Sequence, residues 1–145
     1  LEELDEIFEM RILLEPSCAA AAVSRLSDEE AVRLVKLLTA MDEADPQEPL
    51  AAMGARRAFY LELYSISGRP RMAETIIQLR DHVSRFHVLR SDDGCIHAHQ
   101  ALRDCIKNRD GSVASRVIRD HLVDAHNDQV PESVRLQYAS AGTRE

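Results

Sequence analysis

Glycine and proline are scarce in this sequence, with five of each in 145 residues. No segment alternates apolar and polar residues over the length of a strand, and apolar residues recur at spacings of three and four throughout. These patterns exclude a β-rich fold and predict an all-α protein. Because short connections place successive helices side by side, we expect an antiparallel bundle of six to seven helices.

Cysteines are also few, and long apolar runs are missing. The three cysteines form no C-x-x-C pair, which excludes a disulfide framework and indicates reduced thiols in the core. No window approaches the roughly 18 consecutive apolar residues of a membrane span, and no export signal is present at the N-terminus. We therefore expect a cytoplasmic protein with no membrane partner.

Basic residues are outnumbered, with 18 Lys and Arg against 25 Asp and Glu and a formal net charge of −7. A nucleic-acid surface needs clustered cations to neutralise phosphates, so this segment is not expected to bind DNA itself. The sequence contains no G-x-S-x-G turn, H-E-x-x-H pair or glycine-rich phosphate loop. It thus offers no positive case for an enzyme.

The apolar periodicity divides the chain into helices with recognisable ends. Ser27 and Glu30 form an S-x-x-E capping box, and Gly68 is a typical left-handed helix terminator. Pro16 is expected to kink the first helix or to split it in two. The predicted helices cover about 4–25, 28–44, 50–67, 70–89, 95–108 and 111–130.

Two histidines interrupt the apolar faces of predicted helices. His99 shares its face with Leu102 and Ile106, and His121 shares its face with Ile118. A buried imidazole is costly unless a hydrogen-bond partner, a ligand or a metal satisfies it, so these positions indicate a possible internal site. The alternative is a pair of core imidazoles that backbone carbonyls or Asp side chains satisfy.

Arg56 and Tyr60 are four residues apart and therefore lie on the same face of their predicted helix. Either Arg56 extends to water and Tyr60 packs with its hydroxyl at the edge of the core, or both enter the cavity that His99 and His121 line. Cys95 lies one turn before His99, which suits either a mixed zinc site closed by His121 or a small buried apolar residue.

Several separated segments carry the motifs of one known family. Residues 56–72, RRAFYLELYSISGRPRM, resemble the segment D-x-x-F-H-x-x-L-x-x-A-S-G-N-P-x-L of the C-terminal effector domain (FCD) of FadR-subfamily GntR transcription regulators. EMRILLE at 9–15 resembles the opening helix of that domain, and AHQALRDCI at 98–106 is similar to its E-H-x-x-L-x-x-A-I. RDHL at 119–122 resembles part of its last helix, so the resemblance covers about residues 6–126.

The resemblance implies an all-helical domain that binds a small effector, often a carboxylate metabolite, and forms a homodimer. It also implies a winged-helix domain upstream that binds operator DNA. The chain begins at Leu1 inside a helical pattern, and we expect that this upstream domain is missing from it. The effector domain is assigned to residues 1–130, and residues 131–145 are expected to form a loosely held tail.

The family implies a divalent metal, often zinc or nickel, bound by an Asp and a His one turn apart and by one His on each of two later helices. Those positions fall on Arg56, Tyr60, His99 and His121. Arginine cannot ligate a metal, and its charge repels one, so we expect no metal cofactor. We expect instead that Arg56 forms a bidentate salt bridge with an effector carboxylate, with hydrogen bonds from Tyr60, His99 and His121.

Arg11 and Arg80 are two further candidates for contact with the effector. Arg11 lies where the family has an arginine in its first helix, although a pair with Glu15 one turn later is equally compatible with the spacing. Arg80 lies beside apolar positions of the fourth predicted helix. Two other functions stay open: a metal-dependent helical protein that uses His99 and His121, and a dimerisation module whose pocket has decayed.

Overall fold

The computed structural model describes residues 1–84 and 96–134, with the side chains of 96–98 outside the description. Six long helices account for most of these residues, and the described ranges contain no strand. The predicted all-α class is therefore confirmed. The helices are α1 (Glu2–Ser24), α2 (Asp28–Glu43), α3 (Pro49–Ser65), α4 (Pro70–Ser84), α5 (Ile96–Asn108) and α6 (Gly111–Gln129).

Helix α1 is continuous through Pro16, so the predicted alternative of two separate helices is wrong. The ring of Pro16 is buried, and the helix around it carries the small apolar residues Ala19, Ala22 and Val23, all fully buried. Burial of this apolar face offsets the hydrogen bond that proline removes from the helix.

Two of the predicted helix boundaries have the expected local chemistry. Ser27 accepts a hydrogen bond from the backbone of Glu30, and the Glu30 side chain accepts one from the backbone of Ser27, as a capping box requires. Gly68 has a φ of 73°, and Pro70 opens α4 directly afterwards. Glycine is suited to this left-handed turn because it has no Cβ. The predicted end of α4 near residue 89 and the Asp92–Gly94 break lie outside the described residues.

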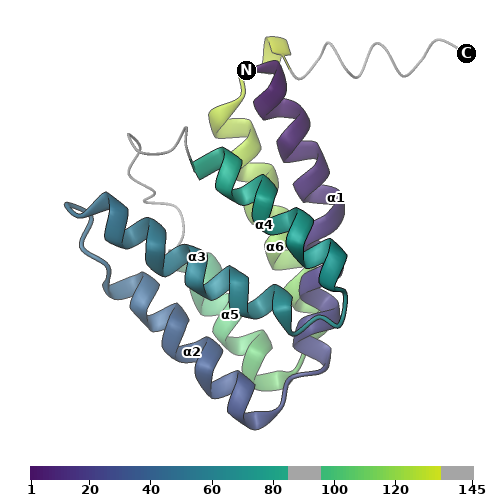
Figure 1. Cartoon of the computed structure of the whole chain (residues 1–145), viewed down its shortest axis with the longest axis vertical. Helices are drawn as coiled ribbons and strands as arrows, with labels where there is room; N and C mark the ends of the chain where they lie inside the picture. The colour runs from purple at the N-terminus through teal and green to yellow at the C-terminus, as the bar shows by residue number, and fades with distance from the viewer. Residues whose placement is uncertain (85–95, 135–145) are drawn as a thin grey trace, which may run out of the picture.

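The helices pack around one main core and a smaller second one. Figure 1 shows α1 and α6 running side by side along the long axis, with α2, α3 and α5 toward the opposite end from the N-terminus. The main core includes Leu34, Phe59 and Ile118, and the second includes Phe8 and Val83. Helix α1 contributes to both cores, so it is the element that joins the two halves of the bundle.

The close packing of α1 on α6 depends on small residues. A Cβ added to Gly111 would lie 2.6 Å from the carbonyl oxygen of Ala20, so any larger residue would push the two helices apart. At the other end of α6, Val130 is fully buried in the second core, and Val134 packs against it after a short helical turn. The remainder of the expected tail, residues 135–145, lies outside the described residues.

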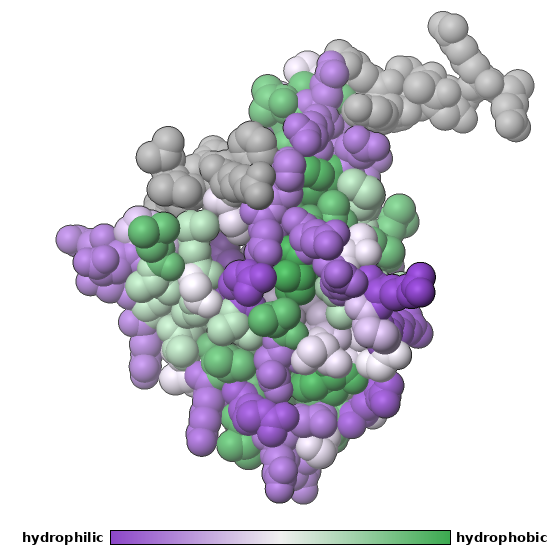
Figure 2. Space-filling view, in the orientation of Figure 1, coloured by the Kyte–Doolittle hydropathy of each residue, from purple (hydrophilic) through white to green (hydrophobic). Residues whose placement is uncertain are grey.

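Figure 2 shows apolar side chains interspersed with polar ones on the visible face. None of the helices formed by the described residues is both long enough and apolar enough to span a bilayer. The large apolar side chains that the structure leaves exposed are Leu1, Leu13, Val32, Leu50, Leu61 and Val123.

Candidate functional site

A buried carboxylate on α1 organises the polar interior of the bundle. Glu15 is fully buried and accepts a hydrogen bond of 2.6 Å from Nε of Arg11, one turn earlier on the same helix. Arg80 of α4 donates to the other carboxylate oxygen from Nη1 at 2.7 Å. Burial by itself raises the pKa of Glu15, but Arg11 and Arg80 outweigh burial and hold the pKa below its ordinary value.

Two tyrosines of α3 complete this ionic centre. The hydroxyl of Tyr64 donates to Glu15 at 2.6 Å, and burial next to that carboxylate raises the pKa of Tyr64 well above its ordinary value. Tyr64 therefore keeps its proton and remains a donor. Tyr60, one turn earlier, presents its ring to the guanidinium of Arg80, whose central carbon lies 3.5 Å from the ring centroid. This cation–π contact fixes the plane of the Arg80 guanidinium.

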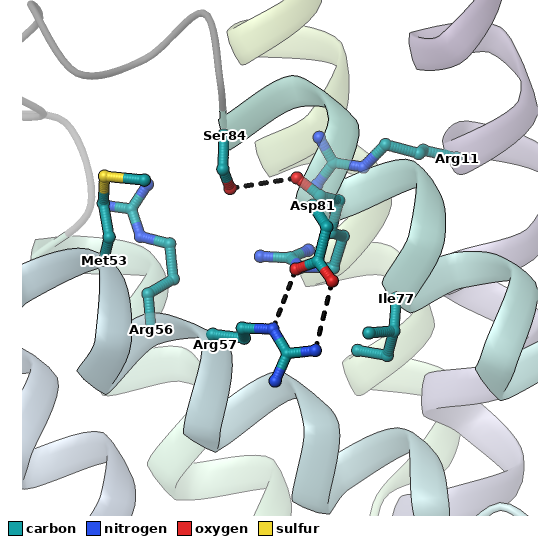
Figure 3. Close-up of a pocket in the computed structure, with 8 residues that line it drawn as sticks. Arg11, Met53, Arg56, Arg57, Ile77, Asp81 and Ser84 are labelled. Carbon is teal, nitrogen blue, oxygen red and sulfur yellow. Dashed lines mark hydrogen bonds and ion pairs between the residues drawn. The ribbon is translucent and has the colours of Figure 1, made fainter. Parts of the chain in front are cut away.

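A small cavity of about 70 Å³ adjoins this centre, where α1, α3 and α4 meet. Figure 3 shows Arg11 reaching it from α1, with Met53, Arg56 and Arg57 on α3 and Asp81 on α4. At about 12 Å³ for each water, the cavity of about 70 Å³ has room for roughly six waters, and hence for a small organic acid. Its described lining consists of Arg11, Met53, Arg56, Arg57, Ile77, Arg80, Asp81 and Ser84.

The cavity is strongly cationic within an acidic chain. Four of its eight described lining residues are arginines and one is an aspartate, whereas the whole chain has a net charge of −7. The charge of Arg57 is neutralised by Asp81, because Nε and Nη2 of Arg57 donate to the two carboxylate oxygens of Asp81 at 2.8 and 3.1 Å. On the inner side, Arg11 and Arg80 both pair with Glu15. Such an arrangement attracts anions.

The structure brings four of the six predicted site residues together. Arg11, Arg56 and Arg80 line the same cavity, and Tyr60 is buried beneath Arg80. Arg11 also makes the predicted intrahelical pair with Glu15.

The two predicted histidines lie elsewhere in the bundle. His99 is buried on α5, and its Nδ1 hydrogen-bonds Oδ1 of Asp42 on α2 at 2.5 Å, while Arg103 pairs with the other oxygen of Asp42. His121 is half-buried on α6. Neither histidine is among the described residues that line the cavity. The His99 imidazole is thus satisfied by an Asp side chain.

The residues at the four family positions do not fit a divalent metal. Arg56 offers no lone pair, its charge repels a divalent cation, and neither His99 nor His121 is among the described residues that line the cavity beside it. Across the described ranges, no three His, Cys, Asp or Glu side chains gather into a possible metal site. Cys95, the sequence candidate for a thiolate ligand, lies outside the described residues.

Sequence reasoning missed most of the polar partners in this region. Glu15 appeared only as an alternative partner of Arg11, yet a carboxylate on the apolar stripe of α1 is itself a signal of a buried ion pair. Tyr64 lies one turn after Tyr60 on the same face, which was a second available signal. The Arg57–Asp81 pair joins two helices and leaves no mark in local spacing.

A second buried acid was also missed, and it lies away from the cavity. Asp5 is fully buried in the first turn of α1, and one of its oxygens bonds Nε2 of His126 at 2.5 Å. The His126 ring stacks on Phe8 with centroids 5.3 Å apart. The other oxygen of Asp5, Oδ2, has no hydrogen-bond partner. This pair ties the start of α1 to the end of α6.

Comparison with known proteins yields one match. The family model described as the FCD domain matches residues 6–124, which is most of the chain and includes α3, α4 and all of α1 after residue 5. Searches of curated proteins and of solved structures returned no significant match.

Proposed function

Because this chain belongs to the FCD domain family, the effector-binding domain of GntR-family regulators, we propose that it senses a small carboxylate in the arginine-lined cavity. The observation that carries this proposal is the gathering of Arg11, Arg56 and Arg80 from three helices around one cavity. Guanidinium groups bind carboxylates through paired, charge-assisted hydrogen bonds, so they supply here the positive charge that a metal supplies elsewhere in the family.

Arg56 is the residue that distinguishes this proposal from metal-dependent binding. It stands at the position of the acidic metal ligand and lines the cavity opposite the α1 and α4 residues. We therefore propose that Arg56 binds the effector from the α3 side, with no metal between them. The two histidines are not needed for this contact, since Asp42 already engages His99.

The proposed output is a change in operator binding by an upstream winged-helix domain, in the cytoplasm and as a homodimer. Ligand binding can shift such an equilibrium only through a difference in affinity between two conformations. The cavity is formed by α1, α3 and α4, so a bound anion would favour the arrangement in which these three helices stay close. Light scattering of the full-length regulator tests the dimer.

Calorimetry tests the binding site directly. In the presence of EDTA at pH 7, we expect at least one of acetate, lactate, butyrate and succinate to bind, and Arg56→Ala to weaken that binding about tenfold or more, the worth of one charged hydrogen bond. Arg33→Ala is the matched control, because Arg33 is an exposed arginine of α2 that pairs with Glu62. This control should bind as the unsubstituted protein does.

Three results would contradict the proposal. Stoichiometric zinc or nickel in the purified protein would restore the metal-dependent alternative. Binding that survives Arg56→Ala unchanged would place the ligand elsewhere. An absence of binding by all four acids would favour a dimerisation module with a decayed pocket.

A further inference from the structure

Two guanidinium groups share a single carboxylate at the inner end of the cavity. Arg11 and Arg80 both line the cavity, and both donate to Glu15 behind it, at 2.6 and 2.7 Å. The formal charge of this group is +2 − 1 = +1, and its members are shielded from water, with side-chain exposures of 8%, 13% and 0% for Arg11, Arg80 and Glu15. A buried excess of one positive charge is costly unless an anion balances it.

Both guanidinium groups retain hydrogen-bonding capacity toward the cavity. Each has five N–H donors, and their described hydrogen bonds to Glu15 use Nε of Arg11 and Nη1 of Arg80. The ring of Tyr60 covers one face of Arg80, which leaves the edge of its guanidinium plane for a further acceptor. A carboxylate in the cavity would thus occupy the side of the two arginines that Glu15 does not.

Glu15 itself is held in place. Its oxygens receive Arg11, Arg80 and the hydroxyl of Tyr64, the last at 2.6 Å, and its side chain is fully buried. A ligand therefore adds to Glu15 as a second acid and does not replace it. The outer part of the cavity holds the ion pair of Arg57 and Asp81, whose charges cancel, so Arg57 has no net charge to offer a third acid.

We infer that Glu15 determines which ligand charge the cavity accepts: as a permanent internal carboxylate, it limits the inner end to one further carboxylate group, held by Arg11 and Arg80. This inference rests on the proposed function and refines it, since the ligand class becomes a small acid that presents a single carboxylate to α1 and α4. Glu15 acts through the two arginines and is a specificity-determining residue without touching the ligand.

Butyrate and succinate form a matched pair of probes, with four carbons each and one or two carboxylates. Their affinities are measured by calorimetry at pH 7 in EDTA for the unsubstituted protein and for Glu15→Gln. Removing a unit charge a few ångströms from the ligand should change the binding of each added ligand charge by about tenfold. We expect Glu15→Gln to tighten the binding of both probes and to raise the affinity for succinate relative to butyrate about tenfold.

Arg80 variants provide an independent measurement if Glu15→Gln fails to fold. Arg80→Gln removes the excess positive charge and should weaken butyrate tenfold or more, whereas Arg80→Lys keeps the charge and should recover most of that loss. Arg33→Gln serves as the matched control, because Arg33 is an exposed arginine of α2 that pairs with Glu62, and its butyrate binding should stay within about threefold of normal. Equal losses in Arg80→Gln and Arg80→Lys would overturn the inference.

The outcomes separate this inference from the proposed function. If the unsubstituted protein binds a carboxylate that Arg56→Ala weakens, but Glu15→Gln leaves the ratio of succinate to butyrate affinity unchanged, only the charge limit is overturned. If no carboxylate binds the unsubstituted protein, the proposed function itself is wrong.

Discussion

At the scale of single residues, the polar interior is arranged around Glu15. This side chain receives donors from α1, α3 and α4, so three helices meet at one carboxylate. Removing one partner of a buried ion pair leaves the other charge buried and uncompensated, and such changes typically lower the free energy of unfolding by about 3–5 kcal/mol. Glu15 therefore combines a structural role with its inferred influence on ligand charge.

Glu15 should also make stability depend on pH. Since its pKa is lower in the folded protein than the ordinary value of 4.5, its contribution is fully present above pH 4.5 and is lost as pH falls through the folded pKa. At pH 7, the free energy of unfolding of Glu15→Gln should be about 3 kcal/mol lower than that of the unsubstituted protein. This difference should become smaller below pH 4.5.

Urea denaturation between pH 3 and pH 7 measures this difference. Glu9→Gln is the control, because Glu9 is an exposed carboxylate of the same helix and its replacement should change stability little at any pH. A constant difference between Glu15→Gln and the unsubstituted protein across this range would show that the charge of Glu15 is not what stabilises the fold.

At the scale of elements, α1 is the central helix, and the turn after α3 determines how α4 packs against it. Helix α1 packs against α3, α4 and α6, and it carries both Arg11 and Glu15. The turn that follows α3 depends on Gly68, whose φ of 73° brings α4 back toward α1. Arg25, just after α1, donates from Nη1 to the carbonyl of Ser67 at 3.2 Å and holds this turn in place.

Two glycines should respond to alanine with opposite signs. Gly54→Ala should stabilise the protein by about 0.5–1 kcal/mol, because Gly54 lies inside α3 with no atom within 4 Å of an added Cβ. Gly68→Ala should destabilise it by about 1–2 kcal/mol through the left-handed φ alone. The added Cβ would also lie 1.7 Å from Nη1 of Arg25 and displace that side chain.

The denaturant midpoints of the two variants, each measured against the unsubstituted protein, report these changes in stability. Because both substitutions are glycine to alanine, a general change in the unfolded chain would shift both midpoints in the same direction. Shifts of the same sign would therefore contradict the conformations assigned to these two glycines.

At the scale of the whole molecule, an acidic bundle encloses a cationic cavity. The chain carries a net charge of −7, yet arginines from α1, α3 and α4 converge at one point between the helices. The net negative charge discourages contact with nucleic acid, while the converging arginines attract an anion of small size. This separation of charge suits the proposed binding of a small carboxylate.

Thermal unfolding should therefore respond to carboxylate and not to metal. A ligand that binds only the folded state stabilises it by about 2.7 kcal/mol at a concentration 100 times its Kd. For a domain of this size we expect butyrate at saturating concentration to raise the Tm by several degrees. Excess EDTA should leave the Tm unchanged.

Arg56→Ala provides the control for this whole-molecule effect, since it should reduce the butyrate shift at the same concentration. A Tm that falls by several degrees in EDTA, and returns when zinc is added, would contradict metal-independent binding. A butyrate shift that Arg56→Ala leaves intact would indicate stabilisation outside the cavity.

Local patterns in the sequence were sufficient to predict the helices and several of their ends. The spacing of apolar residues determines which face of a helix is buried, and caps such as Ser27 and Gly68 act within a few residues of the chain. The family segments likewise placed Arg56 and Tyr60 on one helix, and the structure places both on α3.

Which polar groups meet was decided only by the tertiary structure. Glu15 and Arg80 are 65 residues apart, and Arg57 and Asp81 are 24 apart, so no local spacing relates them. The pairing follows from how α1, α3 and α4 cross, because a buried charge is stable only beside its partner. The sequence by itself determined a helical FCD domain with arginines at unusual positions, and the packing of three helices brought those arginines together at one cavity.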